Sequence, residues 1–220
     1  MQKERVLVTG ASGFIGSNLL DYLLEKDYEV IGLSRQKNLP KIHPHLTWIR
    51  ALEELKHDRI DYVVNLAGES IAQGRWTDAR KQKLIASRVE MTTMLYQYLA
   101  KRKIQPKCII SGSAVGYYGI DPTEQWTECC NEQSAPQSIF MSELCQKWEQ
   151  SARQDTSQNT KIIRLGVVFG RGAGILPQML FPIKMNLCGR IGSGRQPVVW
   201  VHIQDVLRAI EFLMLHETTE

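Results

Sequence analysis

The sequence predicts an α/β fold in which one parallel β-sheet carries helices on both faces. Short apolar runs alternate regularly with longer helical patterns along most of the 220-residue chain. Such alternation is typical of parallel strands joined by right-handed crossovers. The run at 60–68 is nearly all apolar, as expected for a strand that is buried on both faces.

Each expected element rests on a local pattern. Runs of β-branched and other apolar residues predict strands at 5–10, 29–35, 46–50, 60–68, 107–113 and 160–170. Apolar residues at helical spacing predict helices at 15–26, 77–102, 138–153 and 204–216. The polar, turn-rich stretch 119–137 is predicted to be a loop beside a cleft. After residue 170, glycine turns surround a short helix and a short strand at 198–201.

Composition and charge limit the classes of function. The net charge of +4 is spread along the chain and is too small to indicate nucleic-acid binding. No apolar run approaches the roughly 20 residues of a membrane span, and no signal segment precedes the first strand, so we expect a cytoplasmic protein. The five cysteines indicate reduced thiols rather than disulfides or a metal site: Cys108, Cys129, Cys130, Cys145 and Cys188.

The stretch "VLVTGASGFIGSNLL" at 6–20 brings three glycines between the first strand and the first helix. In this position Gly10 allows the turn, Gly13 lets a pyrophosphate approach, and Gly16 lets the helix pack close to the strand. The helix N-terminus supplies free N–H groups and a partial positive charge. The sequence therefore predicts a Rossmann-type dinucleotide site, whose contacts also include Ser12, Phe14 and Ile15.

The end of the second strand predicts which dinucleotide is bound. An acidic residue at this point would accept hydrogen bonds from a ribose 2′-OH and indicate NAD. The chain instead carries Ser34 and Arg35, which can both donate to a 2′-phosphate. We therefore expect NADP(H), with a solvated surface arginine as the alternative interpretation of Arg35.

Several segments together resemble a known family. They are "TGASGFIG" (9–16), "NLAGESIAQGRWTDARKQKLIASR" (65–88), "SGSAVGYYG" (111–119), "RLGVVFG" (164–170) and "GSGRQPVVWVHIQD" (192–205). They are similar to the atypical "epimerase family" branch of the extended short-chain dehydrogenases/reductases, often labelled nucleoside-diphosphate-sugar epimerases. The resemblance implies a Rossmann domain over 1–170 that binds NADP(H). It also implies a small substrate lobe over 171–220, interleaved with the last Rossmann helix. This lobe is expected to be incomplete, either because the chain is a truncated form or because the rest of the lobe is absent.

The resemblance also assigns residues around the cofactor. It implies that Leu66, Ala67 and Gly68 lie along the adenosine and ribose, and that Ser111, Gly112 and Ser113 lie near the nicotinamide. It further implies contacts from the end of the sixth strand, at Leu165, Gly166, Val167 and Val168. Glu69 and Arg88 are additional candidates, with a helix cap and a surface ion pair as the respective alternatives.

Two departures from the resembled family concern chemistry. Its members usually carry Tyr-x-x-x-Lys on the helix at 138–153, where this chain aligns Phe140 and Leu144. A hydroxyl remains at Ser113, and Tyr117 or Tyr118 could handle the proton instead.

The second departure is in the loop that would pair with a substrate diphosphate, where Pro197 and Val198 replace an arginine and Arg195 lies earlier. Two hypotheses therefore stay open. One is an NADP(H)-dependent oxidoreductase or epimerase, and the other is a non-catalytic NADP(H)-binding redox sensor or scaffold. No metal is expected. By analogy, helices 77–102 and 138–153 could pair in a homodimer.

Overall fold

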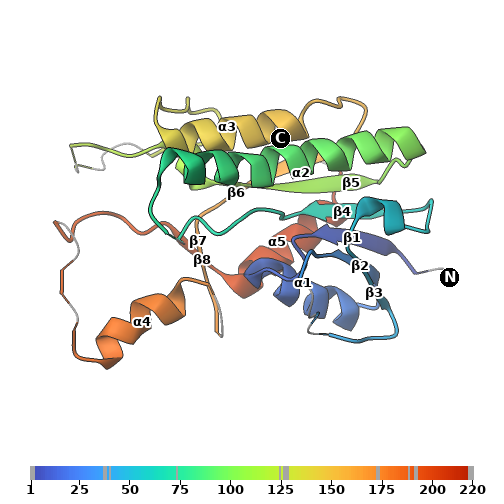
Figure 1. Cartoon of the computed structure of the whole chain (residues 1–220), viewed down its shortest axis with the longest axis horizontal. Helices are drawn as coiled ribbons and strands as arrows, with labels where there is room; N and C mark the ends of the chain where they lie inside the picture. Colours follow the sequence, from blue (N-terminus) through green and yellow to red (C-terminus); the bar gives the residue numbers. More distant parts are fainter. Residues whose placement is uncertain are drawn as a thin grey trace.

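The computed structural model describes residues 3–36, 39, 41–72, 74–123, 125, 129–171, 174–187, 189–190 and 193–217. Its centre is a six-stranded sheet with the order β3-β2-β1-β4-β5-β6, in which every neighbouring pair is parallel. Helices cover both faces of this sheet (Figure 1). The predicted doubly wound α/β fold is therefore confirmed.

The strand order reverses next to the first strand, which places a ligand site there by topology alone. The main strands are β1 (Arg5–Thr9), β2 (Glu29–Leu33), β3 (Leu46–Ile49), β4 (Tyr62–Asn65), β5 (Cys108–Ala114) and β6 (Thr160–Leu165). From β1 the chain moves outward to β2 and β3, then returns to the other side of β1 as β4. Open parallel sheets bind ligands at such a switch point, beyond the carboxyl ends of the strands.

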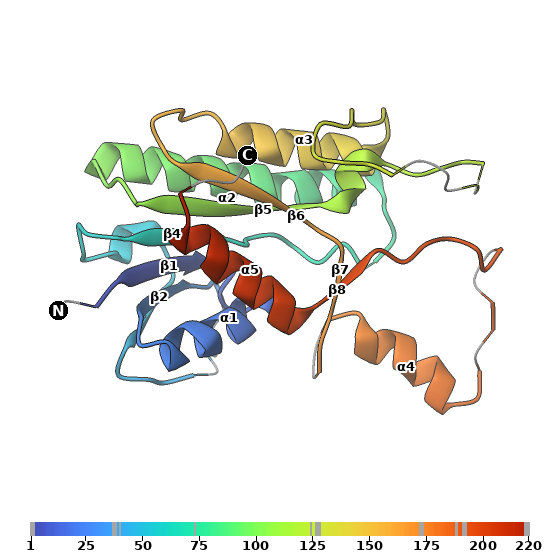
Figure 2. The same cartoon turned by 180° about the vertical axis from the view of Figure 1, so that it is seen from behind.

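Two hydrophobic clusters hold the helices against the sheet. Helices α1 (Phe14–Glu25) and α5 (Ile203–Leu215) cover one face of the sheet. This face is turned toward the viewer in Figure 2. Helix α2 (Asp78–Arg102) covers the other face and packs beside α3 (Phe140–Ala152). Alternate residues of each strand enter opposite clusters, as Val6 and Leu7 do in β1.

The predicted strand at 160–170 is wrong in one respect, because the chain divides it. β6 ends at Leu165, and β7 (Val167–Phe169) pairs instead with β8 (Trp200–His202) in a separate two-stranded sheet. Gly166 makes the division possible, since a Cβ there would lie 2.7 Å from the Val199 carbonyl oxygen. The Val167 N–H donates to that same oxygen at 2.8 Å.

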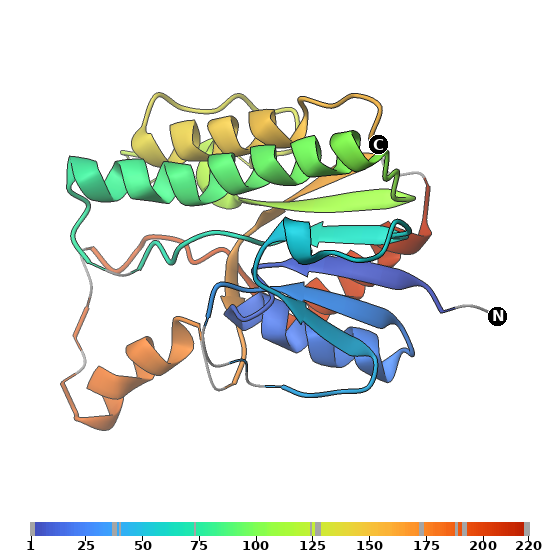
Figure 3. The same ribbon diagram turned by 45° about the vertical axis from the view of Figure 1, so that its right-hand side comes forward.

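The short elements of the chain lie outside the main sheet. Two 3-10 turns that the sequence pattern did not predict, η1 (Leu52–Glu54) and η2 (Val115–Tyr118), follow β3 and β5. Helix α4 (Leu176–Lys184) stands away from the sheet, and none of its residues is buried (Figure 3). In the described part of the chain, no helix is both long enough and apolar enough to cross a membrane.

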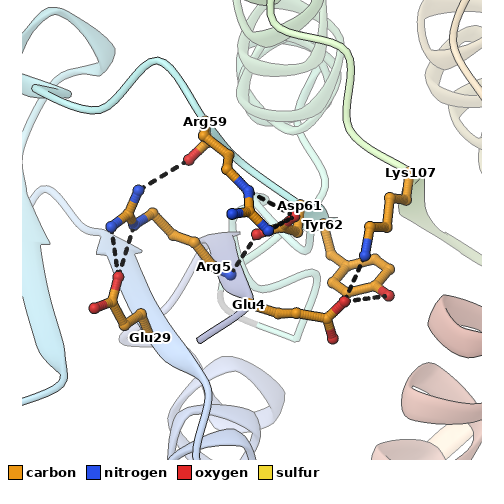
Figure 4. A network of polar contacts seen from close by, with 7 residues as sticks. All are labelled: Glu4, Arg5, Glu29, Arg59, Asp61, Tyr62 and Lys107. Atoms are coloured by element: carbon orange, nitrogen blue, oxygen red, sulfur yellow. Dashed lines mark hydrogen bonds and ion pairs between the residues drawn. The ribbon is translucent and has the colours of Figure 1, made fainter. Parts of the chain in front are cut away.

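Charged side chains connect the amino ends of the strands, at the edge opposite the switch point (Figure 4). Asp61 accepts from the Arg5 backbone N–H at 2.9 Å and from the Arg59 guanidinium at 2.9 Å. Arg5 in turn pairs with Glu29 on β2. This network ties β1, β2 and the start of β4 together. It is separate from the site described below.

Four of the five cysteines lie among the described residues. Cys108 and Cys145 are buried and free, while Cys129 and Cys130 are exposed and free. Cys188 lies outside the described residues.

Candidate cofactor-binding site

The glycine turn after β1 has a geometry that only glycine fits easily. Gly10 has φ +65°, and a Cβ there would lie 2.6 Å from the Leu66 carbonyl oxygen. At Gly16 a Cβ would overlap the Gly10 carbonyl oxygen and lie 2.8 Å from the Ala11 Cα. The Gly13 N–H closes the turn by donating to the Gly10 carbonyl at 2.9 Å. The turn therefore brings the chain directly from the strand into the start of α1.

The N-terminus of α1 is open to a ligand. Within the described residues, no side chain caps it at Gly13, and its first turn holds no acidic residue. The first N–H groups of a helix have no partner within the helix, and its dipole favours an anion there. Phe14, Ile15 and Gly16 supply these N–H groups. The arrangement matches the phosphate-binding end of a Rossmann helix.

The end of β2 is joined to the same turn. The Ser12 and Ser34 hydroxyl oxygens lie 2.6 Å apart, and the Ala11 N–H donates to the Leu33 carbonyl at 3.3 Å. Ser34 is buried, whereas the neighbouring Arg35 is exposed. The predicted 2′-phosphate residues thus lie beside the glycine turn, and Arg35 faces solvent.

Polar side chains join β1 and β4 across the switch point. The Thr9 hydroxyl donates to the Asn65 side-chain oxygen at 2.6 Å, and the Asn65 amide donates to Thr92 of α2 at 2.9 Å. The Leu66 N–H donates to the Thr9 backbone carbonyl, and the Ala67 N–H donates to the Thr9 hydroxyl, both at 3.3 Å. Leu66 and Ala67 are therefore fixed next to the glycine turn.

Arg88 reaches from α2 to the segment that follows β4. Its guanidinium donates to the Leu84 carbonyl at 3.2 Å and to the Glu69 carbonyl at 2.8 Å. It lies 5.2 Å from the centre of the Trp148 ring, and a Cβ at Gly68 would be only 3.0 Å from its central carbon. Burial lowers the pKa of Arg88. The side chain belongs to this corner of the site rather than to a surface ion pair.

The Glu69 carboxylate is turned toward α2. Arg80 donates to it at 2.5 Å, and the Lys83 ammonium lies 3.3 Å away. The hydrogen bond from Arg80 lowers the pKa of the Glu69 carboxyl group. The Glu69 backbone N–H donates to the Ser87 hydroxyl at 3.2 Å. The cap of α2 is Thr77 rather than Glu69.

The carboxyl end of β5 holds two buried serines with different partners. Ser111 accepts from the Asn65 amide at 3.3 Å, inside the sheet. Ser113 donates to the Glu149 carboxylate of α3 at 2.7 Å. Gly112, between them, packs against Trp148, whose ring would lie 3.2 Å from a Cβ at that position.

Glu149 and Arg164 form the main charged pair of this corner, and the sequence interpretation overlooked both. The Arg164 Nε and Nη2 groups donate to the Glu149 carboxylate at 2.8 and 2.9 Å. The Arg164 guanidinium also covers the Tyr117 ring at 3.5 Å and donates to the Tyr118 hydroxyl at 3.1 Å. The structure thus gathers Ser113, Tyr117 and Tyr118 around one ion pair.

Helix α3 presents different residues from those aligned with Tyr-x-x-x-Lys. Leu144 is 1% exposed, and Phe140 packs edge-on against Trp76 with ring centres 5.6 Å apart. Cys145 is the residue beside Ser113. Burial raises the pKa of its thiol, and hydrogen bonds to the Ala114 backbone and to Ser113 oppose that rise.

The remaining predicted residues occupy the connections at the carboxyl edge. Leu165 ends β6, Gly166 links the two sheets, and Val167 and Val168 begin β7. Arg195 is exposed, and its backbone N–H donates to Ser193 at 3.2 Å. A cavity of about 360 Å³ lies elsewhere, over β2, β3 and η1, and includes none of the predicted site residues.

The switch point, the glycine turn and the open helix end define a Rossmann-type dinucleotide-binding protein. The profile of the NAD dependent epimerase/dehydratase family matches residues 6–220. The chain belongs to this NAD(P)-binding family.

Similar proteins agree with this membership. An epimerase family protein of Staphylococcus saprophyticus is 36% identical over 212 residues, which are 94% of this chain and 70% of that protein. The crystal structure of the human epimerase family protein SDR39U1 (isoform 2) with NADPH has a TM-score of 0.83 and 34% identity. That match covers 98% of this chain and 72% of the human one. A nucleoside-diphosphate sugar epimerase of Corynebacterium glutamicum gives a TM-score of 0.76 at 27% identity, over 97% of this chain and 44% of that one.

Proposed function

We propose that this protein binds NADP(H) at the N-terminus of α1 and uses it as an oxidoreductase or epimerase. The observation that carries the proposal is the uncapped helix end behind the glycine turn, with Ser34 hydrogen-bonded into that turn. The turn and the Phe14–Gly16 N–H groups would hold the pyrophosphate, and Ser34 with Arg35 would hold the 2′-phosphate. The human relative crystallised with NADPH supports this choice over NAD.

The rest of the site would enclose the adenosine and nicotinamide halves. Leu66, Ala67, Gly68 and Arg88 would flank the riboses, while Ser113 and residues 165–168 would lie near the nicotinamide. A bound nicotinamide supplies or takes up a hydride at its C4 atom. Ser113, with Tyr117 or Tyr118, would hold the substrate oxygen. Residues 171–220 would contribute the substrate lobe.

A second candidate function follows from α3. The residues of this helix near Ser113 are Cys145 and Glu149, and no tyrosine–lysine pair is present in it. A protein that binds NADP(H) as a redox sensor, without turning a substrate over, would show the same cofactor geometry.

Binding titrations with NADPH and NADH test the proposal. The wild type should prefer NADPH, and Arg35→Ala should remove most of that preference. Loss of one charge-assisted contact of about 1.5–3 kcal/mol corresponds to roughly 10- to 100-fold in affinity. Arg208→Ala, which removes an exposed arginine of α5, is the matched control. Equal affinities of the wild type for the two cofactors would refute the NADP(H) assignment.

Turnover separates the two candidate functions. NADPH consumption is measured over a panel of carbonyl compounds, and the interconversion of epimers, which consumes no net NADPH, is measured over a panel of sugar nucleotides; both use wild type and Ser113→Ala. Turnover that Ser113→Ala abolishes supports the enzyme. Tight NADPH binding without turnover supports the sensor.

A further inference from the structure

The direction of the hydrogen bond at Ser113 has a chemical consequence. A serine hydroxyl has one proton to donate and two lone pairs that can accept. Ser113 is 4% exposed, Glu149 is 5% exposed, and their oxygens lie 2.7 Å apart. Because an ionised carboxylate can only accept, the proton of this bond belongs to Ser113.

Arg164 holds the carboxylate in its accepting role. Both Glu149 oxygens receive guanidinium N–H groups, at 2.8 and 2.9 Å. The hydrogen bond to Glu149 raises the pKa of Arg164, so the cation persists. Arg164 is itself fixed by Tyr117, Tyr118 and the Glu132 carbonyl, to which it donates at 3.1 Å. Arg153 adds a more distant positive charge, 3.7 Å from Glu149.

Cys145 does not compete for the Ser113 proton. Burial raises the pKa of the Cys145 thiol, which keeps it neutral. A neutral thiol is a weak acceptor, whereas a charge-assisted bond to a carboxylate is about twice as strong as a neutral one. The proton of Ser113 is therefore committed to Glu149, and only lone pairs remain for a ligand.

We propose that Glu149 is a positioning residue that makes Ser113 a hydrogen-bond acceptor toward its ligand. The inference rests on the proposed function, because the ligand is the nicotinamide end of the cofactor or the substrate beside it. The ligand group held at Ser113 is then a donor, either the carboxamide N–H of the nicotinamide or a hydroxyl of the substrate. When the substrate oxygen is a carbonyl, its hydrogen bond would come from Tyr117 or Tyr118 rather than from this serine.

Cofactor analogues test the first source of the donor without any turnover. The probes are NADP⁺ and its acetylpyridine analogue, in which a methyl ketone replaces the carboxamide and removes its N–H groups. If the carboxamide is the donor, the wild type binds NADP⁺ roughly 2- to 10-fold more tightly than the analogue, the effect of one ordinary hydrogen bond. Ser113→Ala then binds both equally.

A double variant tests the role of Glu149 itself. Glu149→Leu with Arg164→Met removes the acceptor of the Ser113 proton and leaves no unpaired buried charge, a replacement that buried ion pairs often tolerate. With its proton free, Ser113 can donate to either probe, so the discrimination is lost although the hydroxyl remains. Ser151→Ala, which deletes a buried hydroxyl bonded to the Trp148 carbonyl at 2.7 Å, is the matched control. Thermal unfolding of each variant verifies folding.

If the wild type does not discriminate, NADP⁺ reduction is measured over a panel of secondary alcohols and polyols. A fall in kcat in both Ser113→Ala and the double variant, at unchanged NADP⁺ affinity, then identifies the substrate hydroxyl as the donor. The proposal is overturned if neither effect is seen, or if the double variant discriminates like wild type. Failure of the wild type to bind NADP⁺ at all would instead refute the proposed function.

Discussion

Substitution of Gly13 by alanine should remove cofactor binding while leaving the fold in place. Its φ of −74° is available to any residue, and within the described chain only the Gly10 carbonyl oxygen, at 3.1 Å, lies within 4 Å of the added Cβ. The loss of stability is therefore about 1 kcal/mol, as for alanine at a helix N-cap. The methyl group enters the open space before α1, where the pyrophosphate would lie. Loss of two charge-assisted bonds of about 1.5–3 kcal/mol each lowers NADPH affinity by at least roughly 100-fold.

Gly10→Ala serves as the contrast, because its main effect should be on the stability of the fold. Its φ of +65° costs an alanine about 1–2 kcal/mol, and the 2.6 Å approach to Leu66 adds about 1–3 kcal/mol of overpacking. Gly189→Ala is the control, because a Cβ there meets nothing within 4 Å of it in the described residues.

NADPH fluorescence titration and urea unfolding are measured for all three variants. Wild-type NADPH affinity in a folded Gly13→Ala protein would refute the assignment of the pyrophosphate site. A Gly10→Ala protein that unfolds at the same urea concentration as wild type would contradict the strain argued for that position.

Two further predictions concern stability. Asp61→Ala should lower the free energy of unfolding by about 1–3 kcal/mol, because it removes the buried carboxylate that accepts from the Arg5 N–H, whereas the half-exposed Arg59 guanidinium remains in contact with water; urea unfolding with a loss below about 0.5 kcal/mol would contradict this. Burial raises the pKa of Tyr96 to about 12. The folded state then holds this proton where the unfolded state has released it, so stability falls between about pH 10 and 12, by up to about 2.7 kcal/mol. Tyr96→Phe should reduce that alkaline loss of stability. It also lowers the free energy of unfolding at neutral pH, because it removes the 2.8 Å hydrogen bond to Thr160. An unchanged dependence of stability on pH would contradict the raised pKa of Tyr96.

The sequence pattern was sufficient for the architecture because most elements are locally encoded. Apolar runs predicted every strand of the main sheet, and helical spacing predicted the helices that cover it. It missed the division at Gly166, because that break depends on the approach of Val199, which is distant along the chain. The turns η1 and η2, of three and four residues, are also too short to show a helical pattern in the sequence.

The site was only partly predictable, and α3 shows why. The glycines have a fixed spacing, so the turn that they form follows from sequence. The rotation of this helix sends Leu144 into the interior and brings Cys145 and Glu149, one turn apart, to Ser113, and that rotation does not follow from the position of a motif in the sequence. No local spacing connects Glu149 with Arg164, since only the pairing of β5 with β6 places Arg164 beside Ser113.

A crystal structure of the full chain with NADPH tests the central claim most directly. The account predicts the pyrophosphate against the N–H groups of Phe14, Ile15 and Gly16, with the 2′-phosphate bonded to Ser34 and Arg35. The nicotinamide should then lie beside Ser113. A pyrophosphate bound away from the N-terminus of α1, or a 2′-phosphate that contacts neither Ser34 nor Arg35, would contradict it.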